Sequence, residues 1–189
     1  MNGLPPPTDR YITFFGAISP PATTNLRIGL CALVNEGAKK ITILFASPGG
    51  STDDGIALYT FLTALPVELT MHAAGVVASI AIPVFLASSN RIASKNARFM
   101  FHEYTWTYAQ GNVTQTTMAG NTLALSEAVA WTKEIIIQRT KLTDGDFQTR
   151  RFFEQPVLMN PSDAVKAGLI SDIAEPAMAT ATRPMVIIT

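Results

Sequence analysis

Apolar and polar residues alternate along this chain with two different periods. Short runs rich in β-branched and aromatic residues, typical of strands, recur between stretches whose apolar residues are spaced three and four apart, as in helices. The predicted strands cover residues 11–15, 40–45, 67–72, 91–92, 98–101 and 169–173. The predicted helices cover residues 26–34, 52–64, 77–86, 115–140, 147–153 and 162–167. This repeated order predicts an α/β fold with helices packed on a sheet.

Length and composition favour one domain that contacts other subunits. The 189 residues are enough for a sizeable core, and no linker is long enough to divide them. Charged residues make up only 15% of the chain, so contact between subunits would cover some of its apolar surface. We expect a single domain over residues 1–189, with a flexible N-terminal segment at 1–10 and a weakly specified tail at 175–189.

The charge pattern excludes some classes of partner. Fourteen basic residues balance 14 acidic ones, which gives no electrostatic reason to expect nucleic acid or an anionic membrane. The N-terminus lacks the features of a signal peptide, and the longest apolar stretch, 73–87, is too short to span a bilayer. We therefore expect a cytoplasmic protein. The single cysteine, Cys31, is predicted to be a small buried hydrophobe.

Three short segments that each follow a predicted strand carry the candidate chemistry. They are Ala-Ser-Pro-Gly-Gly-Ser at 46–51, Gly-Val-Val-Ala-Ser-Ile at 75–80 and Phe-His-Glu at 101–103. Sites in open α/β sheets gather at the carboxyl ends of strands, so these three segments could converge on one crevice.

Each segment also has a plain structural interpretation. Ser79 lies at a predicted helix start, where a serine is commonly an N-cap, yet the free N–H groups there would also favour developing negative charge. His102 could be a general base or a structural strand-end residue. The other histidine, His72, is the alternative base. It is so close in sequence to Ser79 that we expect it to pack beneath a turn at Gly75. The Gly49–Gly50 turn could be an ordinary loop or could bring an N–H close to a ligand.

In this order and spacing, the segments resemble the proteolytic subunit of the Clp protease, the ClpP family. That family carries a Ser-Pro-Gly-Gly turn, a Gly-x-Ala-Ala-Ser-Met turn and a Met-Ile-His-Gln-Pro segment. This chain has Ser-Pro-Gly-Gly at 47–50, Gly-Val-Val-Ala-Ser-Ile at 75–80 and Phe-Met-Phe-His-Glu-Tyr at 99–104. Residues 14–18, 90–93 and 161–170 are also similar to family segments, so the resemblance covers roughly 11–173.

The resemblance implies a ClpP/crotonase-like fold of stacked βαβ units with a protruding helical handle after His102. It implies a serine endopeptidase that hydrolyses unfolded chains or short peptides without cofactor or metal. Ser79 would be the nucleophile and His102 its base, and the N–H groups of Gly49 and Ile80 would form the oxyanion hole. The subunits would form a homo-oligomer of two stacked seven-membered rings, fed with polypeptide by an AAA+ unfoldase.

The chain departs from the family at the third catalytic residue. The family's aspartate falls on or near Pro156, counting back from Ala164. Glu154 is the nearest acid and our tentative candidate, and Asp144 and Asp146 are further ones. A backbone carbonyl or a water could also complete a Ser–His dyad. In addition, Glu103 stands where the family has glutamine, beside the base.

Three alternatives stay open. A catalytically impaired ClpP-like assembly subunit is motivated by Pro156. A crotonase-fold acyl-CoA enzyme would share the fold and the paired N–H groups, although a serine paired with a histidine has no role in its chemistry. A Ser–Lys dyad, as in signal-peptide peptidase relatives, would need Lys95 or Lys133 at the site and is disfavoured by His102.

Overall fold

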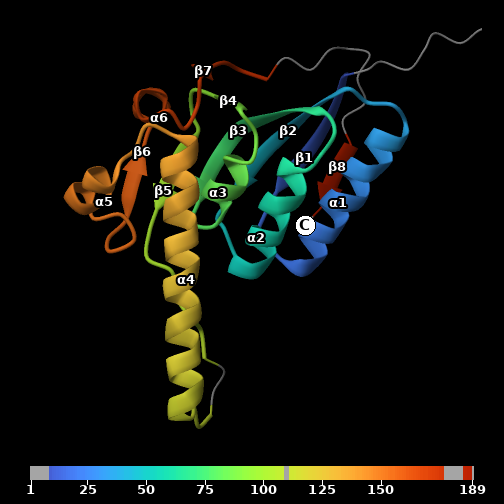
Figure 1. Cartoon of the computed structure of the whole chain (residues 1–189). Coiled ribbons are helices and arrows are strands. Elements are labelled where there is room, and N and C mark those ends of the chain that lie inside the picture. The colour runs from blue at the N-terminus through green and yellow to red at the C-terminus, as the bar shows by residue number, and fades with distance from the viewer. Residues whose placement is uncertain (1–8, 109–110, 177–184, 189) are drawn as a thin grey trace, which may run out of the picture.

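The computed structural model describes residues 9–108, 111–176 and 185–188 and confirms the α/β class (Figure 1). Its strands are β1 (Asp9–Phe15), β2 (Lys40–Ser47), β3 (Glu68–Ala78), β4 (Asn90–Ala93), β5 (Arg98–Phe101), β6 (Val157–Met159), β7 (Asp172–Ile173) and β8 (Met185–Ile188). Its helices are α1 (Pro20–Asn35), α2 (Thr52–Thr63), α3 (Ala81–Phe85), α4 (Gln115–Arg139), α5 (Asp144–Arg150) and α6 (Pro161–Ala167).

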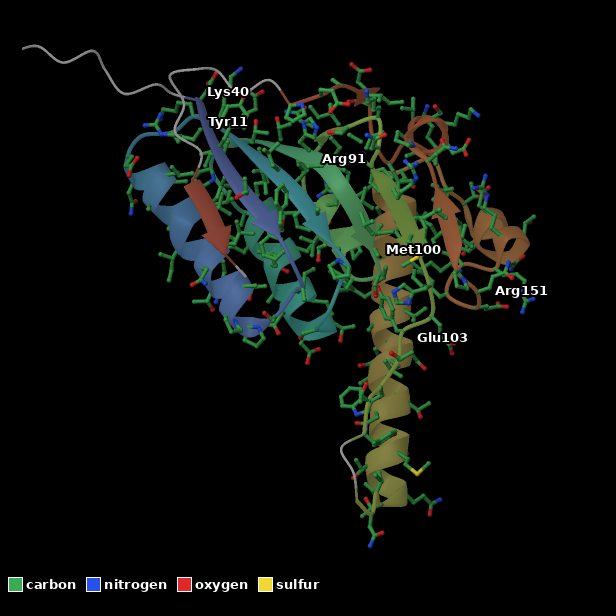
Figure 2. All side chains as sticks on the ribbon, turned by 180° about the vertical axis from the view of Figure 1, so that it is seen from behind. Tyr11, Lys40, Arg91, Met100, Glu103 and Arg151 are labelled. Atoms are coloured by element: carbon green, nitrogen blue, oxygen red, sulfur yellow. The ribbon has the colours of Figure 1, made fainter. Side chains whose placement is uncertain are left out.

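The strands form one sheet in the order β6-β5-β3-β2-β1-β8, with β4 beside β3 and β7 beside β4. The pairings are parallel except that between β5 and β6. Helices α1, α2 and α3 lie on the sheet face that is in front in Figure 1, and Figure 2 looks onto the opposite face. Side chains alternate along β1 and β2, so Phe14 and Phe45 both point into the core and stack at 5.4 Å between ring centroids.

Strand β3 organises the site because it has two successive partners on one edge. Its first half pairs with β4, and its last residues pair with β5. The strand continues through Gly75, so the turn predicted there is wrong and the helix predicted at 77–86 shrinks to α3. The reason is pairing with β2 and β5, which no local pattern reveals. At Gly75 the two neighbouring strands approach closely, since an added Cβ would lie 3.1 Å from the Cβ of Ala46.

Other differences lie in the second half of the chain. The helix predicted at 147–153 is α5 instead, because Thr143 caps it through a capping box with Asp146. Strands β6 and β8 were not predicted, and β8 lies in the tail expected to be weakly specified. The N-terminal segment predicted to be flexible falls almost wholly outside the described residues. Cys31 is exposed on α1, which corrects the expectation that it is buried.

Helix α4 leaves the body of the molecule as an arm (Figure 1). It has 25 residues, and its buried positions, Ala128, Thr132, Ile135 and Ile136, lie in the half nearest the sheet. The outer half exposes apolar side chains such as Met118 and Leu123. Within the described ranges, no helix combines the length and apolar character needed to cross a bilayer.

A buried guanidinium joins this arm to the sheet. Arg91 on β4 is 9% exposed and donates from Nε to the Leu169 carbonyl at 2.7 Å. Its terminal nitrogens donate to the carbonyls of Ser88, Arg139 and Gly168. Arg139 ends α4 and Gly168 caps α6, so two helix C-termini direct their negative dipole ends at one cation. Burial lowers the pKa of Arg91, and the nearby charge of Arg139 adds to this.

Replacing Arg91 with methionine is expected to destabilise the fold by about 3 kcal/mol, since it leaves several buried carbonyls without a donor. Urea unfolding followed by circular dichroism would measure the loss. The control is Arg27→Met, which removes an exposed guanidinium bonded only to Thr24 in its own helix. Equal effects of the two substitutions would contradict the role given to Arg91.

Candidate functional site

Ser79 lies between β3 and α3 in a backbone conformation that is unusual for serine. Its φ is +58°, in the left-handed region that disfavours side chains with a Cβ. Two backbone bonds hold it there: the Ser79 N–H donates to the Met100 carbonyl of β5 at 3.0 Å, and the Ile82 N–H donates to the Ser79 carbonyl at 3.0 Å. The strained turn is therefore fixed by the neighbouring strand and by the first turn of the helix.

The side chain of Ser79 is not a helix cap. The residue in the N-cap position of α3 is Ile80, which makes no side-chain capping bond. Among the described residues, nothing hydrogen-bonds to the Ser79 hydroxyl or to the Ile80 N–H. A hydroxyl and an adjacent amide are thus both available to a ligand.

Gly49 lies directly against Ser79. A Cβ built on Gly49 would lie 2.7 Å from the Cβ of Ser79 and 2.9 Å from the Ala78 carbonyl oxygen, and φ at Gly49 is +94°. Only glycine fits both the contact and the conformation. The sequence segments 46–51 and 75–80 therefore converge, as predicted from their places after β2 and β3.

The loop carrying Gly49 is clamped from the other side by Ile18. The Ile18 N–H donates to the Gly49 carbonyl at 2.8 Å, and the Ser51 N–H donates to the Ile18 carbonyl at 2.9 Å. The Gly49 N–H itself donates to the buried Ser47 hydroxyl at 3.1 Å. A ligand that takes the Gly49 N–H must therefore compete with Ser47 for it.

His102 follows β5 two residues after Met100, the residue whose carbonyl holds the Ser79 N–H. Its Nδ1 lies 2.7 Å from the backbone carbonyl oxygen of Glu103. A carbonyl can only accept, so Nδ1 carries the hydrogen and Nε2 of the neutral ring has a free lone pair. The imidazole is thus held in the tautomer that a general base needs. No hydrogen bond joins His102 to Ser79 in this structure.

The carboxylates proposed from the sequence have other partners. Glu154 forms an exposed ion pair with Arg151 at 2.9 Å, and Arg151 lies beside α5, away from β5, in Figure 2. Asp146 accepts from Thr143 within the α5 cap, which lowers the pKa of its carboxyl. Asp144 pairs with Lys133.

The register of β5 with β6 shows what faces His102. The pairs are Phe99 with Met159, Met100 with Leu158 and Phe101 with Val157. One further step in this register sets Pro156 opposite His102. Directly opposed residues of antiparallel strands have their Cβ atoms about 5 Å apart on one face. By this continuation of the register, the position counted back from Ala164 would be the one opposite His102, and it holds a proline.

The alternative bases considered from the sequence, one histidine and two lysines, have other surroundings. His72 is fully buried and its Nε2 lies 3.0 Å from the Ser94 hydroxyl. Burial lowers the pKa of His72, with a partly compensating attraction to Glu175, and this favours the neutral ring. Lys133 is committed to Asp144, and Lys95 is exposed.

Sequence reasoning missed three groups that shape the site: the Ile18 backbone, the Ser47 hydroxyl and the Glu103 carbonyl. Ser47 and Ile18 lie inside segments that the family resemblance had already selected, which is the only signal they carried. A backbone carbonyl has no signature in a sequence, because every residue has one.

Comparison with known proteins agrees with this geometry. A sequence model described as Clp protease matches residues 8–177. Two relatives are each named as an ATP-dependent Clp protease proteolytic subunit. The protein from Bdellovibrio bacteriovorus is 24% identical over 180 residues, which are 88% of this chain and 79% of the relative. The protein from Carsonella ruddii is 25% identical over 167 residues, which are 87% of this chain and 84% of the relative.

The fold also matches a solved structure. A mutant of ClpP1 from Listeria monocytogenes superposes with a TM-score of 0.76 at 19% identity, over 88% of this chain and 92% of that one. This confirms the expected ClpP/crotonase-like fold. Because the family model matches most of its length, the chain belongs to the Clp protease family.

Proposed function

We propose that this chain is a serine endopeptidase subunit that hydrolyses peptide bonds through Ser79 and His102. The observation that carries the proposal is Ser79 itself: a strained serine with an unoccupied hydroxyl, packed against Gly49 and followed by an unbonded N–H at Ile80. Strain of this kind persists where the surrounding structure fixes it, as it does at many functional sites.

In the proposed reaction, Nε2 of His102 takes the hydroxyl proton as the Ser79 oxygen bonds to the substrate carbonyl carbon. The N–H groups of Ile80 and Gly49 stabilise the resulting oxyanion, with Gly49 leaving Ser47 to do so. The tetrahedral intermediate collapses, and the leaving amine takes the proton from His102. Water then repeats the sequence on the acyl-enzyme, which frees the acid and restores the serine.

The Glu103 carbonyl takes part of the role usually given to an acid in this scheme. It keeps the hydrogen on Nδ1, which secures the correct tautomer of His102. It has no full negative charge with which to stabilise the imidazolium that forms. Glu154 stays our candidate for an acid that completes the site, and it would have to leave Arg151.

We further propose that the subunits assemble into stacked rings through the α4 arm. Support comes from exposed apolar side chains, Met118 and Leu123 on the arm and Trp106 and Tyr108 on the segment after His102, for which a second copy would provide cover. We also propose polypeptide substrates, an AAA+ unfoldase partner and seven-membered rings, which the family resemblance implies, and a cytoplasmic location, which rests on the N-terminal sequence.

A fluorophosphonate probe is expected to label Ser79. The mass of the labelled tryptic peptide identifies the site, and Ser79→Ala should abolish both labelling and peptidase activity. Ser94→Ala is the matched control, because it removes a buried serine that is hydrogen-bonded to the other histidine, His72. A folded, assembled protein that stays unlabelled would instead support the impaired assembly subunit that Pro156 suggests.

Gly49→Ala is expected to lower kcat about 100-fold to 1,000-fold, as loss of one oxyanion-hole donor does. The added methyl would push against Ser79 and Ala78. Hydrolysis of a fluorogenic peptide measures the change. Gly37→Ala is the matched control, since its φ is +88° and its added Cβ would meet nothing within 4 Å. If both variants lost the same activity, general backbone strain would explain the result.

Pro156→Asp is expected to raise kcat/KM by roughly tenfold or more, because a carboxylate there would face His102 and stabilise its charged form. Pro156→Asn is the neutral control and should give a smaller gain.

Glu154→Gln tests which group supports His102. A large loss of activity would assign the role to the Glu154 carboxylate and overturn the assignment to the Glu103 carbonyl.

A further inference from the structure

A sizeable pocket opens beside His102, between the base of α4 and the segment that follows α5. Its volume is about 530 Å³, within the usual range for ligand sites. Glu103 lines it, so the residue whose carbonyl holds the imidazole also forms part of the pocket wall. Figure 2 shows Glu103 just beyond Met100 at the end of β5. A group bound in this pocket would therefore lie next to the proposed reaction centre.

The pocket wall is mainly apolar and firmly supported. Tyr104 anchors one side: its hydroxyl lies 2.9 Å from the Thr132 hydroxyl of α4, and burial raises its pKa to about 12. Phe147 and Phe152 pack on the other side, with their rings tilted by 59° and their centroids 4.9 Å apart. The apolar lining comprises Leu125, Val129, Phe147, Phe152 and Phe153.

Of the three charged side chains that line the pocket, two have ionic partners and one does not. Lys133 is paired with Asp144 and lies 5.5 Å from the centroid of the Phe147 ring. Glu154 is paired with Arg151. The Glu103 carboxylate, in contrast, has no ionic or hydrogen-bonding partner among the described residues. The pocket thus joins an apolar interior to one uncompensated negative charge.

From this arrangement we infer that the pocket binds a lysine or arginine side chain of the substrate next to the bond that is cut. The aliphatic stem would lie along the apolar wall, and the cationic head would meet the Glu103 carboxylate. This deepens the proposed peptidase function, on which it rests, by giving the enzyme a preference for basic residues in place of broad tolerance. Glu103 is then a specificity-determining residue through its side chain, separately from its carbonyl.

Binding tests this without requiring catalysis. Short peptides that contain lysine, Nε-acetyl-lysine or norleucine at one position are titrated into the assembled Ser79→Ala protein by calorimetry. These side chains share an aliphatic stem, and only lysine is charged. Lysine is expected to bind roughly threefold to tenfold more tightly than the other two, as for a partly exposed ion pair, and the difference should shrink in high salt.

Glu103→Gln in the same background should remove the preference for lysine, since it keeps the size and the backbone carbonyl and loses the charge. The matched control, Glu127→Gln, removes an exposed carboxylate from α4 outside the pocket wall and should leave the preference intact. Equal binding of the three peptides, or a preference that survives Glu103→Gln, would overturn the inference.

Cleavage by the protein with Ser79 intact separates this inference from the proposed function. Faster cleavage beside lysine or arginine than beside norleucine would support both. Cleavage without that preference would overturn the inference alone. Lysine-selective binding without any cleavage would support the pocket and count against the peptidase proposal.

Discussion

The carbonyls around Arg91 hold together two parts of the chain that the site requires. Its guanidinium takes the end of α4 and the cap of α6 as hydrogen-bond acceptors while its own strand stays in the sheet beside β3. A buried cation would ordinarily be costly, and among the residues that the structure describes no carboxylate pairs with it. Carbonyls at helix ends, which carry partial negative charge and have no N–H donor within their own helix, compensate for it instead. The buried guanidinium thereby gains hydrogen-bond acceptors, and the helix-end carbonyls gain a donor.

The positions of Ser79 and His102 depend on these hydrogen bonds of Arg91. With the end of α4 fixed, the hydroxyls of Thr132 and Tyr104 can form their hydrogen bond. This bond holds the segment after His102 against the arm. With α6 fixed, β6 before it pairs with β5 and orders the strand that leads to His102. Strand β5 in turn gives its Met100 carbonyl to the Ser79 N–H. Loosening the base of the arm would therefore alter the serine turn through β5.

The elements that the sequence predicts well are those whose signal is local. The strands and helices up to residue 64 follow from apolar spacing and from the Gly49–Gly50 turn, and the structure confirms them within about two residues, except that α1 begins at Pro20, well before the predicted start at residue 26. Prediction fails where distant segments decide. The end of β3 is a strand only because β5 pairs with it, and β6 is too short to show a period.

The same distinction applies to the site. Its three segments could be selected from the sequence because each has an unusual composition at the end of a strand. The position of Pro156 could be located by counting along the chain, and the β5–β6 register independently sets it opposite His102. The positive φ of Ser79 and the bond from His102 to the Glu103 carbonyl could not be predicted, since both depend on backbone groups that any residue supplies.

A neutral carbonyl and a carboxylate are not equivalent partners for an imidazole. Both fix the hydrogen on Nδ1, but only the carboxylate offers a full charge to the imidazolium, and that attraction is strong where water is excluded. At Pro156 the chain lacks this charge. One residue after His102, the chain carries Glu103, which lines the pocket and whose carboxylate has no partner among the described residues. If that charge serves the substrate, a basic side chain bound there brings a positive group near the histidine. Paired with the Glu103 carboxylate, that group adds no net charge beside the imidazolium that forms during the proposed reaction.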